Sequence, residues 1–459
     1  GDVTLCLNGK MISCGTGAAI QVKGVNNKNI TFTLCDCEGS GVITHTGNDE
    51  NDKGGNGVDV ANSNNGGNNE VAKFIMYNGH ITKNKGSGEY LNDSTSFTMY
   101  GGRITQNGYN NTSLFGGYGG GVYVHTDATF TMYGGNITGN YADTNGGGVH
   151  VGSETANFTM YGGSITENHA NKSGGGIYSN SNNISIYGGS VTDNSVTKNG
   201  KAGGIYVSSS DTLTVGGNVN ISGNWQGNEN SSISNNNANN VYLPTNSTIT
   251  IEKALTGENS SIGVTTATPV ATTKDASVKI AAGKGTHAIT GEDKGHFTPD
   301  TGYCEVQKKD DGALYLTHVH TGGEATCTAA AKCGGCGQSY GNTNLNNHAL
   351  VHHEAKAPTC TAVGWEAYDT CSRCDYSTTK VEIPMAPHTY SETEWKSDVD
   401  NHWHECSVCH TQIDKAEHNW KDATYTAPKT CVCGATQGEP LTRSYYYYAP
   451  SAAEDKKDS

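Results

Sequence analysis

The sequence predicts an all-β protein in which a right-handed parallel β-helix is followed by small Cys/His modules stabilised by metal. Three observations predict this fold class. A phrase of 11 residues recurs in the first part of the chain, for example FTMYGGNITGN from Phe130 and FTMYGGSITEN from Phe158. Within each copy, apolar and polar residues alternate with the period of two that is typical of strands. From Thr317 onward the phrase is absent, and cysteine and histidine become frequent.

The spacing of the copies favours a solenoid. They start 23 to 33 residues apart, at Phe74, Phe97, Phe130, Phe158, Ile184 and Leu213. Such a period indicates a solenoid, a propeller or an array, and a propeller blade requires about 40 residues. Helical stretches long enough for βα units are missing between the copies. Three short strands in each turn therefore predict a parallel β-helix over residues 1–317, in which 241–317 form the last coils and the cap.

Equivalent residues of successive copies should lie above one another, because neighbouring coils are about 4.8 Å apart. Phe97, Phe130 and Phe158 should form an inward stack. Asparagines recur at one turn, where stacked amides can satisfy one another and the backbone. They are Asn84, Asn107, Asn140, Asn168, Asn194 and Asn224. The glycine pairs should supply positive φ angles or close approach at the corners.

Composition and charge exclude several classes of partner. The net charge of −15 argues against nucleic acid and anionic membrane surfaces. The sequence contains no run of 18 or more apolar residues, so we expect no membrane insertion. The opening residues, GDVTLCLNGK, do not form a signal peptide. We expect that a signal peptide was removed or that the sequence was trimmed.

The repeat motifs resemble a known family. The alternation of GG(G)-[VI]-Y with [IV]-T-x-N resembles the right-handed β-helix repeats of bacterial surface proteins, including polymorphic outer-membrane adhesins. The segments VTLCLNG, FTLCDCEGSGVITH and NNVYLPTNSTITI are similar to parts of large sortase-anchored β-helix proteins of anaerobic gut Firmicutes. This resemblance covers residues 1–317 and implies a secreted protein attached to the bacterial cell wall. Residues 441–459 would then be a polar linker towards a missing wall anchor.

The Cys/His segment (residues 318–440) contains 10 of the 15 cysteines. Two modules are predicted in 318–383 and two more in 384–440, the last a degenerate copy with C-x-C. Each C-x2-C pair places two thiolates on one turn, and a further Cys and a His would complete a Cys3His shell. The candidate ligands, module by module, are His320, Cys327, Cys333 and Cys336; His353, Cys360, Cys371 and Cys374; His388, His404, Cys406 and Cys409; and His418, Cys431 and Cys433. His348 and His352 compete with His353 for the second module, and His402 also lies in the third.

We predict structural zinc at these ligands. A segment this small and this poor in apolar residues cannot bury enough surface to fold unaided, and metal would supply the missing stability. Two alternatives remain open. The thiols could form disulfides, although the interleaved histidines argue against this. The ions could be catalytic, although four protein ligands leave no position for a substrate. This segment also resembles the Cys/His modules that the same Firmicute proteins carry near the end that is attached to the cell wall.

The remaining cysteines form no comparable pattern. Cys6, Cys35 and Cys37 lie in predicted strands, and Cys6 is expected to stack over Cys35 as part of a small-residue ladder. Cys14 and Cys304 have no evident partner.

Catalysis was considered because pectin-lyase-like enzymes share this solenoid. Such enzymes need carboxylates, often with calcium, or several Asp on adjacent coils. Glu167 and Asp193 are the one adjacent outward pair of carboxylates in the turn positions of the repeat. The stretch DENDKG has Lys53 where a calcium loop needs a ligand oxygen. We therefore expect no enzyme activity.

Two outward aromatic columns are the best candidate binding surfaces, because tyrosine is amphipathic and loses little entropy on binding. Stacking between strands is the alternative explanation for each column. The first column consists of Tyr77, Tyr100, Tyr133, Tyr161 and Tyr187, and the second of Tyr123, His150, Tyr178 and Tyr206.

The expected function is that of a monomeric, non-catalytic bacterial adhesin that presents a β-helix face to host glycans or host proteins. One alternative is a specific host-protein binder, such as an immunoglobulin-binding surface protein. The other is a polysaccharide lyase or glycoside hydrolase.

Overall fold

The computed structural model describes residues 1–24, 28–45, 55–62, 71–108, 117–208, 212–227 and 238–447. The stretch DENDKG (residues 49–54), which was compared with a calcium loop, lies outside the described residues. The chain divides into two compact units. One contains residues 1–324 and 331–340, and the other contains 325–330 and 341–459. No helix in the described part of the chain is long and apolar enough to cross a membrane.

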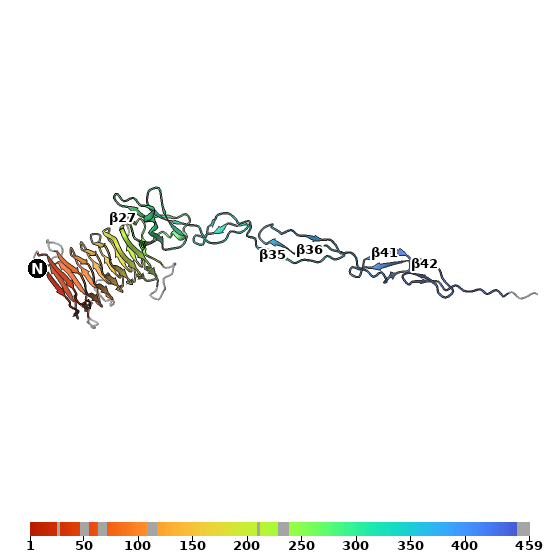
Figure 1. The fold of residues 1–459 in the computed structure, drawn as a ribbon, viewed down its shortest axis with the longest axis horizontal. Helices are drawn as coiled ribbons and strands as arrows, with labels where there is room; N and C mark the ends of the chain where they lie inside the picture. Colours follow the sequence, from red (N-terminus) through yellow and green to blue (C-terminus); the bar gives the residue numbers. More distant parts are fainter. Residues whose placement is uncertain are drawn as a thin grey trace, which may run out of the picture. The chain divides into compact units, whose positions relative to one another are not determined.

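The first unit is a parallel β-helix, as predicted. Each coil contributes strands to three faces, and each strand pairs in parallel with its equivalent one coil away. Figure 1 shows these strands stacked in sequence order from the N-terminus to β27. In β21 and β24 the first two faces are joined in one long bent strand, with a register shift at the bend.

The strands of each face follow one another along the coil. The first face contains β1 (Val3–Cys6), β4 (Ile30–Cys35), β7 (Ala72–Met76), β10 (Ser96–Met99), β13 (Thr129–Met132), β17 (Asn157–Met160), β21 (Ile184–Thr192), β24 (Thr212–Ser222), β27 (Thr248–Leu255) and β29 (Ser277–Gly283). The second contains β2 (Met11–Cys14), β5 (Val42–His45), β8 (His80–Thr82), β11 (Arg103–Thr105), β14 (Asn136–Thr138), β18 (Ser164–Thr166), β28 (Ser261–Thr266) and β30 (Phe297–Pro299). The third contains β3 (Ile20–Gly24), β6 (Val58–Asn62), β9 (Glu89–Leu91), β12 (Val122–Val124), β16 (Val149–Val151), β20 (Ile177–Ser179), β23 (Ile205–Val207) and β26 (Val241–Leu243). A short fourth ladder contains β15 (Tyr141–Ala142), β19 (His169–Ala170), β22 (Ser195–Val196) and β25 (Trp225–Gln226).

The predicted inward stack is confirmed. Phe97, Phe130 and Phe158 occupy equivalent register positions, and all three side chains are fully buried. Their ring centroids are 4.9 Å apart, and Phe74 extends the stack by one coil at 4.8 Å. Because each ring packs on its own copy, one short phrase repeated along the chain is enough to build a continuous apolar core.

The predicted asparagine ladder is confirmed and is longer than expected. Each side-chain Nδ2 donates to the Oδ1 of the next asparagine at 2.9–3.0 Å, and the backbone N–H of the same residue donates to the same oxygen. The ladder continues from Asn224 through Asn240 to Asp300. The Asp300 carboxylate accepts from both the backbone and the side chain of Asn240, at 2.8 and 2.6 Å. Every bond of the ladder is thus donated towards the C-terminal end. The ladder ends at Asp300, whose carboxylate accepts and does not donate.

The glycine pairs make the corners possible. Gly135 has a φ of +89°, and a Cβ atom there would lie 2.6 Å from Cε of Met99 in the preceding coil. Gly102 and Gly163 have the same conformation and face the equivalent methionines. Only glycine tolerates both constraints at this position.

The β-helix ends in an antiparallel cap. Strand β32 (Leu314–His318) pairs with β29 on one side and with β31 (Cys304–Lys308) on the other. The short helices η1 (Val270–Thr272) and α1 (Gly291–Gly295) complete the cap, and Thr290 and Asp293 form a capping box on α1. The change to antiparallel pairing ends the parallel ladder at strands that the coils alone would leave open.

The Cys/His segment contains only short antiparallel pairings. In the first unit β33 (Ala331–Lys332) pairs with β34 (Ser339–Tyr340). In the second unit the strands are β35 (Leu350–His353) with β37 (Tyr368–Cys371), β36 (Gly364–Trp365) with β38 (Glu382–Ile383), β39 (Lys396–Ser397) with β40 (Asn401–Glu405) and β41 (Gln412–Glu417), and β42 (Trp420–Lys421) with β43 (Lys429–Cys431) and β44 (Thr436–Gln437). Among the described residues beyond Leu316, the buried apolar side chains are Ala331 and five cysteines. This segment therefore has no aliphatic core of its own.

Candidate metal centres

Four groups of cysteine and histidine converge within the described residues, and each group offers four ligand atoms that lie within 4.8 Å of one another. We number them along the chain. Site 1 is His318, His320, Cys333 and Cys336; site 2 is Cys327, His348, Cys371 and Cys374; site 3 is Cys360, His388, Cys406 and Cys409; and site 4 is His402, His418, Cys431 and Cys433.

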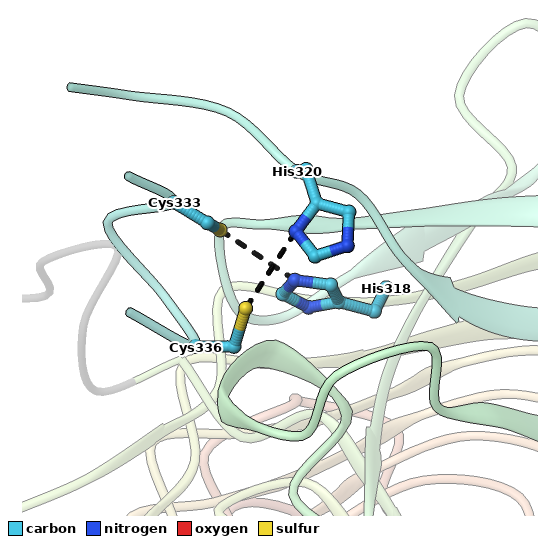
Figure 2. Close-up of side chains that lie close together, drawn as sticks. All are labelled: His318, His320, Cys333 and Cys336. Atoms are coloured by element: carbon cyan, nitrogen blue, oxygen red, sulfur yellow. Dashed lines mark hydrogen bonds between the residues drawn. The ribbon is translucent and has the colours of Figure 1, made fainter. Parts of the chain in front are cut away.

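Site 1 joins the end of the β-helix cap to the turn between β33 and β34 (Figure 2). His318 is the last residue of β32, and its Nε2 lies 3.5 Å from Sγ of Cys333. Nδ1 of His320 lies 3.6 Å from Sγ of Cys336. The other nitrogen of each ring has an oxygen neighbour: the Val270 carbonyl 3.0 Å from His318 Nδ1, and a carboxylate oxygen of Asp275 3.5 Å from His320 Nε2. Such outer contacts orient a metal-ligating histidine and fix its tautomer.

Sites 2 and 3 have the same Cys3His composition. In site 2 Nδ1 of His348 lies 3.4 Å from Sγ of Cys374, and the imidazole stacks on Tyr376 with centroids 3.8 Å apart. In site 3 Nδ1 of His388 lies 3.3 Å from Sγ of Cys409. His388 is the exposed ligand of site 3, whereas Cys406 in the same site is fully buried.

Site 4 is complete, although the sequence pattern predicted a degenerate copy. Nδ1 of His402 lies 3.4 Å from Sγ of Cys431, and Nδ1 of His418 lies 3.5 Å from Sγ of Cys433. Nε2 of His418 faces the carbonyl of Asp398 at 3.0 Å. The second histidine therefore replaces the third cysteine, and four ligands remain.

The distances match the edges of a tetrahedron around one ion. Ligand sulfurs about 2.3 Å from a tetrahedral ion lie about 3.8 Å from one another. The Sγ atoms of Cys327 and Cys371 are 3.7 Å apart, and those of Cys360 and Cys406 are 3.8 Å apart. A disulfide requires about 2.05 Å, and all of these cysteines are free. The geometry therefore favours metal over the disulfide alternative, and four protein ligands at each site leave no open position for a substrate.

The contacts within the sites shift the pKa of several thiols, some downward and some upward. For Cys406, N–H groups of Cys409 and Val408 lower the pKa to about 5 despite the opposing effect of burial. For Cys333, burial raises the pKa, but backbone N–H groups of Cys336 and Thr321 outweigh it and bring the value to about 5. The pKa of Cys360 is instead raised to about 11, first through its contact with the Cys409 sulfur. Three sulfurs that converge in this way repel one another as thiolates, and a cation removes that repulsion.

The structure groups the predicted ligand residues differently from the prediction. Cys327 belongs to site 2 and Cys360 to site 3, one module later than expected, and His402 belongs to site 4. Backbone pairing explains the shift: the N–H of Cys327 donates to the Asn347 carbonyl at 3.1 Å, directly before His348. Grouping ligands by proximity in sequence could not reveal such a crossing.

Two predicted ligands are corrected and two others are added. His353 lies outside the clusters, where its Nε2 faces the Thr370 hydroxyl at 2.8 Å and its ring stacks on Tyr368. His404 also lies outside them, with its ring on Trp395. His318 was missed, and His348 had been only a competitor for its place. Their separation from the C-x2-C pair gave no common signal, since His318 and His348 precede Cys333 and Cys371 by 15 and 23 residues.

The first outward column is confirmed as an exposed stack, which we call the outer tyrosine row (Tyr77, Tyr100, Tyr133, Tyr161 and Tyr187). Ring centroids along it are 4.9–5.6 Å apart. The first four side chains are 46–53 % exposed. Tyr187 ends the row with its hydroxyl 2.6 Å from Glu252 and Lys253 over its ring. Because the rings cover one another's faces, the row presents edges and hydroxyl groups to solvent.

The second column stacks as predicted but is not an open surface. Tyr123, His150, Tyr178 and Tyr206 lie 5.0–5.1 Å apart, and Tyr90 and Tyr242 extend the stack. His150 is only 3 % exposed, and Tyr118 packs against its ring. Burial lowers the pKa of His150 to about 3. This column is therefore mainly a stabilising stack.

A shallow groove of about 490 Å³ lies on the second face, next to the outer tyrosine row along the chain. It is lined by His80, Arg103, Thr105, Gln106, Asn136, Thr138, Gly139, Ser164, Thr166 and Glu167. Burial lowers the pKa of His80, and the positive charges of Arg103 and Lys83 lower it further. Glu167 and Asp193 occupy the same left-handed turn in adjacent coils, each with a φ of 56°. The groove thus has a cationic end at Arg103 and an acidic end at Glu167.

The N-terminal cysteines stack as expected. Cys6 and Cys35 are register partners in β1 and β4. The Sγ atoms of Cys6 and Cys37 are 2.7 Å apart, and the thiol of Cys14 lies 2.9 Å from the Thr16 carbonyl. No metal cluster forms at these residues in the described structure.

Comparison with known proteins gave no relative: no protein family matches the chain, and no curated protein or solved structure is similar to it.

Proposed function

We propose that this chain is a non-catalytic bacterial cell-surface protein whose β-helix binds glycans and whose Cys/His segment is held together by structural zinc. The outer tyrosine row and the adjoining groove carry this proposal. Tyr100 and Tyr133 are each followed by two glycines and then by a groove residue, Arg103 or Asn136. Aromatic edges and hydroxyls therefore lie one corner of the coil away from side chains that donate and accept hydrogen bonds.

This combination suits a sugar chain better than an apolar ligand. A glycan offers hydroxyl groups along its length, which amide, guanidinium and phenol groups can bind. The row repeats at 4.9–5.1 Å between Tyr77 and Tyr161, so successive sugars of an extended chain could each meet an equivalent set of groups. The groove is open and shallow, which favours binding of a polymer segment over enclosure of a small substrate.

Zinc is the ion proposed for the four sites. Tetrahedral sets of two or three thiolates with imidazole are the usual shells of structural zinc, whereas calcium and magnesium prefer oxygen ligands. Location at the cell surface, secretion and attachment to the wall rest on the resemblance to sortase-anchored Firmicute proteins. In such a protein the Cys/His segment would separate the binding domain from the wall.

The proposal is tested by glycan-array binding of the full chain and of a Tyr100→Ala/Tyr133→Ala variant. We expect bound glycans and a loss of at least about tenfold in affinity for the variant, since each buried aromatic contact contributes up to a few kcal/mol. Tyr425→Ala is the matched control, because Tyr425 is 57 % exposed in the Cys/His segment.

Three other outcomes would redirect the assignment. Capture of a single mucosal protein, such as an immunoglobulin, with no glycan bound would favour the host-protein binder. Shortening of a glycan by the purified chain would establish a lyase or hydrolase. Equal glycan binding by the double variant and the wild type would remove the outer tyrosine row from the site.

A further inference from the structure

The ligands of sites 2, 3 and 4 are interleaved along the chain. Cys360 of site 3 lies between His348 and Cys371, which both belong to site 2. His402 of site 4 lies between His388 and Cys406, which both belong to site 3. An ion at one site thus closes a chain loop that carries a ligand of the next site.

Cys360, the ligand that the site 2 loop contributes to site 3, is held on a defined turn. In Thr359-Cys360-Thr361-Ala362, the Thr359 N–H donates to the Ala362 carbonyl at 2.9 Å, and the Ala362 N–H donates to Oγ1 of Thr359 at 3.1 Å. Cys360 lies at the tip of this turn. The same two bonds form in Thr326-Cys327-Thr328-Ala329 and in Thr424-Tyr425-Thr426-Ala427. In the last copy the tip residue is Tyr425, which is no ligand.

The turn is also tied to the segment that carries the next histidine. The Ala386 N–H donates to the Thr359 carbonyl at 3.0 Å, two residues before His388. One step further, the His418 N–H donates to the Asp400 carbonyl at 3.2 Å, two residues before His402. The segments that carry Cys360 and His388 are therefore held together by the backbone as well as by their shared site.

We propose that sites 2, 3 and 4 bind their ions with positive coupling, so that the second unit folds as one metal-linked series rather than as independent modules. The cause is chain entropy: an ion at site 2 restricts the loop 348–371 and so reduces the cost of presenting Cys360. Apolar burial cannot replace this restraint, because the unit buries almost no apolar side chain other than cysteine. Coupling is reciprocal, so an ion at site 3 strengthens site 2 equally. This inference does not depend on what the β-helix binds.

Site occupancy can be read cysteine by cysteine. The full chain is equilibrated in reducing buffer at a series of buffered free-zinc concentrations, thiols are alkylated briefly, and peptides are analysed by mass spectrometry. Metal-bound thiolates are protected, so Cys406 and Cys409 report on site 3 and Cys431 and Cys433 on site 4. The test variant is Cys374→Ser, which removes a ligand of site 2 alone.

Coupling free energies between sites commonly change affinity 5- to 150-fold, and we expect that Cys374→Ser requires about tenfold more free zinc to protect Cys406 and Cys409. If Cys406 and Cys409 of the variant are not protected at any zinc concentration, site 3 depends completely on site 2, which is the strongest form of the proposed coupling. Midpoints within about twofold of the wild type would overturn the proposal.

A second variant touches no ligand. Thr359→Ala removes the hydroxyl that holds the turn of Cys360, and we expect a several-fold higher zinc requirement at site 3 with all of its ligands present. Thr424→Ala removes the same bond from the turn of Tyr425, which carries no ligand, and should raise the zinc requirement of site 3 less than Thr359→Ala does. Equal effects of the two variants would contradict the role of the Thr359 turn in presenting Cys360 to site 3.

Discussion

The β-helix and the Cys/His segment are both built from small repeating units, but the side chains that fill their interiors differ. A single coil of the β-helix buries Phe130 only because Phe97 and Phe158 lie on either side of it, and a single Cys/His module buries little besides its own ligands. In both regions the repeating unit is too small to be stable alone. The coil obtains its core from its neighbours, whereas the module gathers the ligand atoms of a candidate metal site, and in sites 2 to 4 one ligand comes from the module before it.

Removal of metal should produce the largest difference between the two regions in hydrogen-exchange protection. We expect a strong chelator to abolish hydrogen-exchange protection over residues 341–440, because structural zinc contributes roughly 10–16 kcal/mol to such modules. Residues 71–108 and 117–208 of the β-helix should keep their protection, and added zinc should restore the rest. Protection that persists in the metal-free Cys/His segment would mean that an interior other than metal stabilises it.

Phe130→Ala should destabilise the β-helix and leave the Cys/His segment unaffected. We expect a loss of about 3–5 kcal/mol of unfolding free energy for the β-helix, because a fully buried ring leaves a cavity, with unchanged zinc content. Denaturant unfolding of the variant would be compared with that of Tyr133→Ala, three residues further on and just beyond β13, which should cost less than about 1 kcal/mol since Tyr133 is half exposed. Equal costs would show that the inner stack is not the core.

Glu89 is a buried acidic residue in the apolar interior of the β-helix, and an apolar substitution should stabilise the protein. It lies in register with Val58 and Val122 and is fully buried, and neither carboxyl oxygen has a hydrogen-bond partner in the described structure. Burial raises its pKa well above the usual value, so the folded state holds a proton that the unfolded state releases. Stability is therefore fully present below the unfolded pKa and is lost as pH rises from there through the folded pKa. Glu89→Val should stabilise by about 1–3 kcal/mol at pH 7 and less at pH 4, measured by urea unfolding. A destabilised variant would indicate a role for the carboxyl.

His150 should produce the smallest effect, with the opposite pH dependence. Its pKa in the folded state is about 3, so below pH 6.5 the unfolded state binds a proton that the folded state does not. Stability should fall by about 2 kcal/mol between pH 6.5 and pH 5, since each pKa unit corresponds to about 1.4 kcal/mol. His150→Tyr, which matches its neighbours in the stack, should remove this loss in thermal unfolding at the two pH values. An unchanged pH dependence would place the titrating group elsewhere.

Sequence reasoning was accurate where a property is local and repeated. The inner phenylalanine stack, the asparagine ladder and the outer tyrosine row follow from strand alternation and from copies at a fixed period. The burial of His150 could not be predicted in this way, because it depends on Tyr118, which lies outside the repeat phrase. The end of the asparagine ladder at Asp300 was hidden for the same reason, since Asp300 is 60 residues from its partner Asn240.

The sequence by itself determined that one region is a solenoid and that the other contains enough thiolate and imidazole for four ions. Those facts depend only on residue types and their spacing. The tertiary structure alone decided which of these side chains lie together in one candidate metal site. Cys327 and Cys360 reach across to the following histidine because backbone hydrogen bonds fold each turn onto the next module, and a tetrahedral shell is satisfied by closeness in space, however far apart its ligands are in the chain.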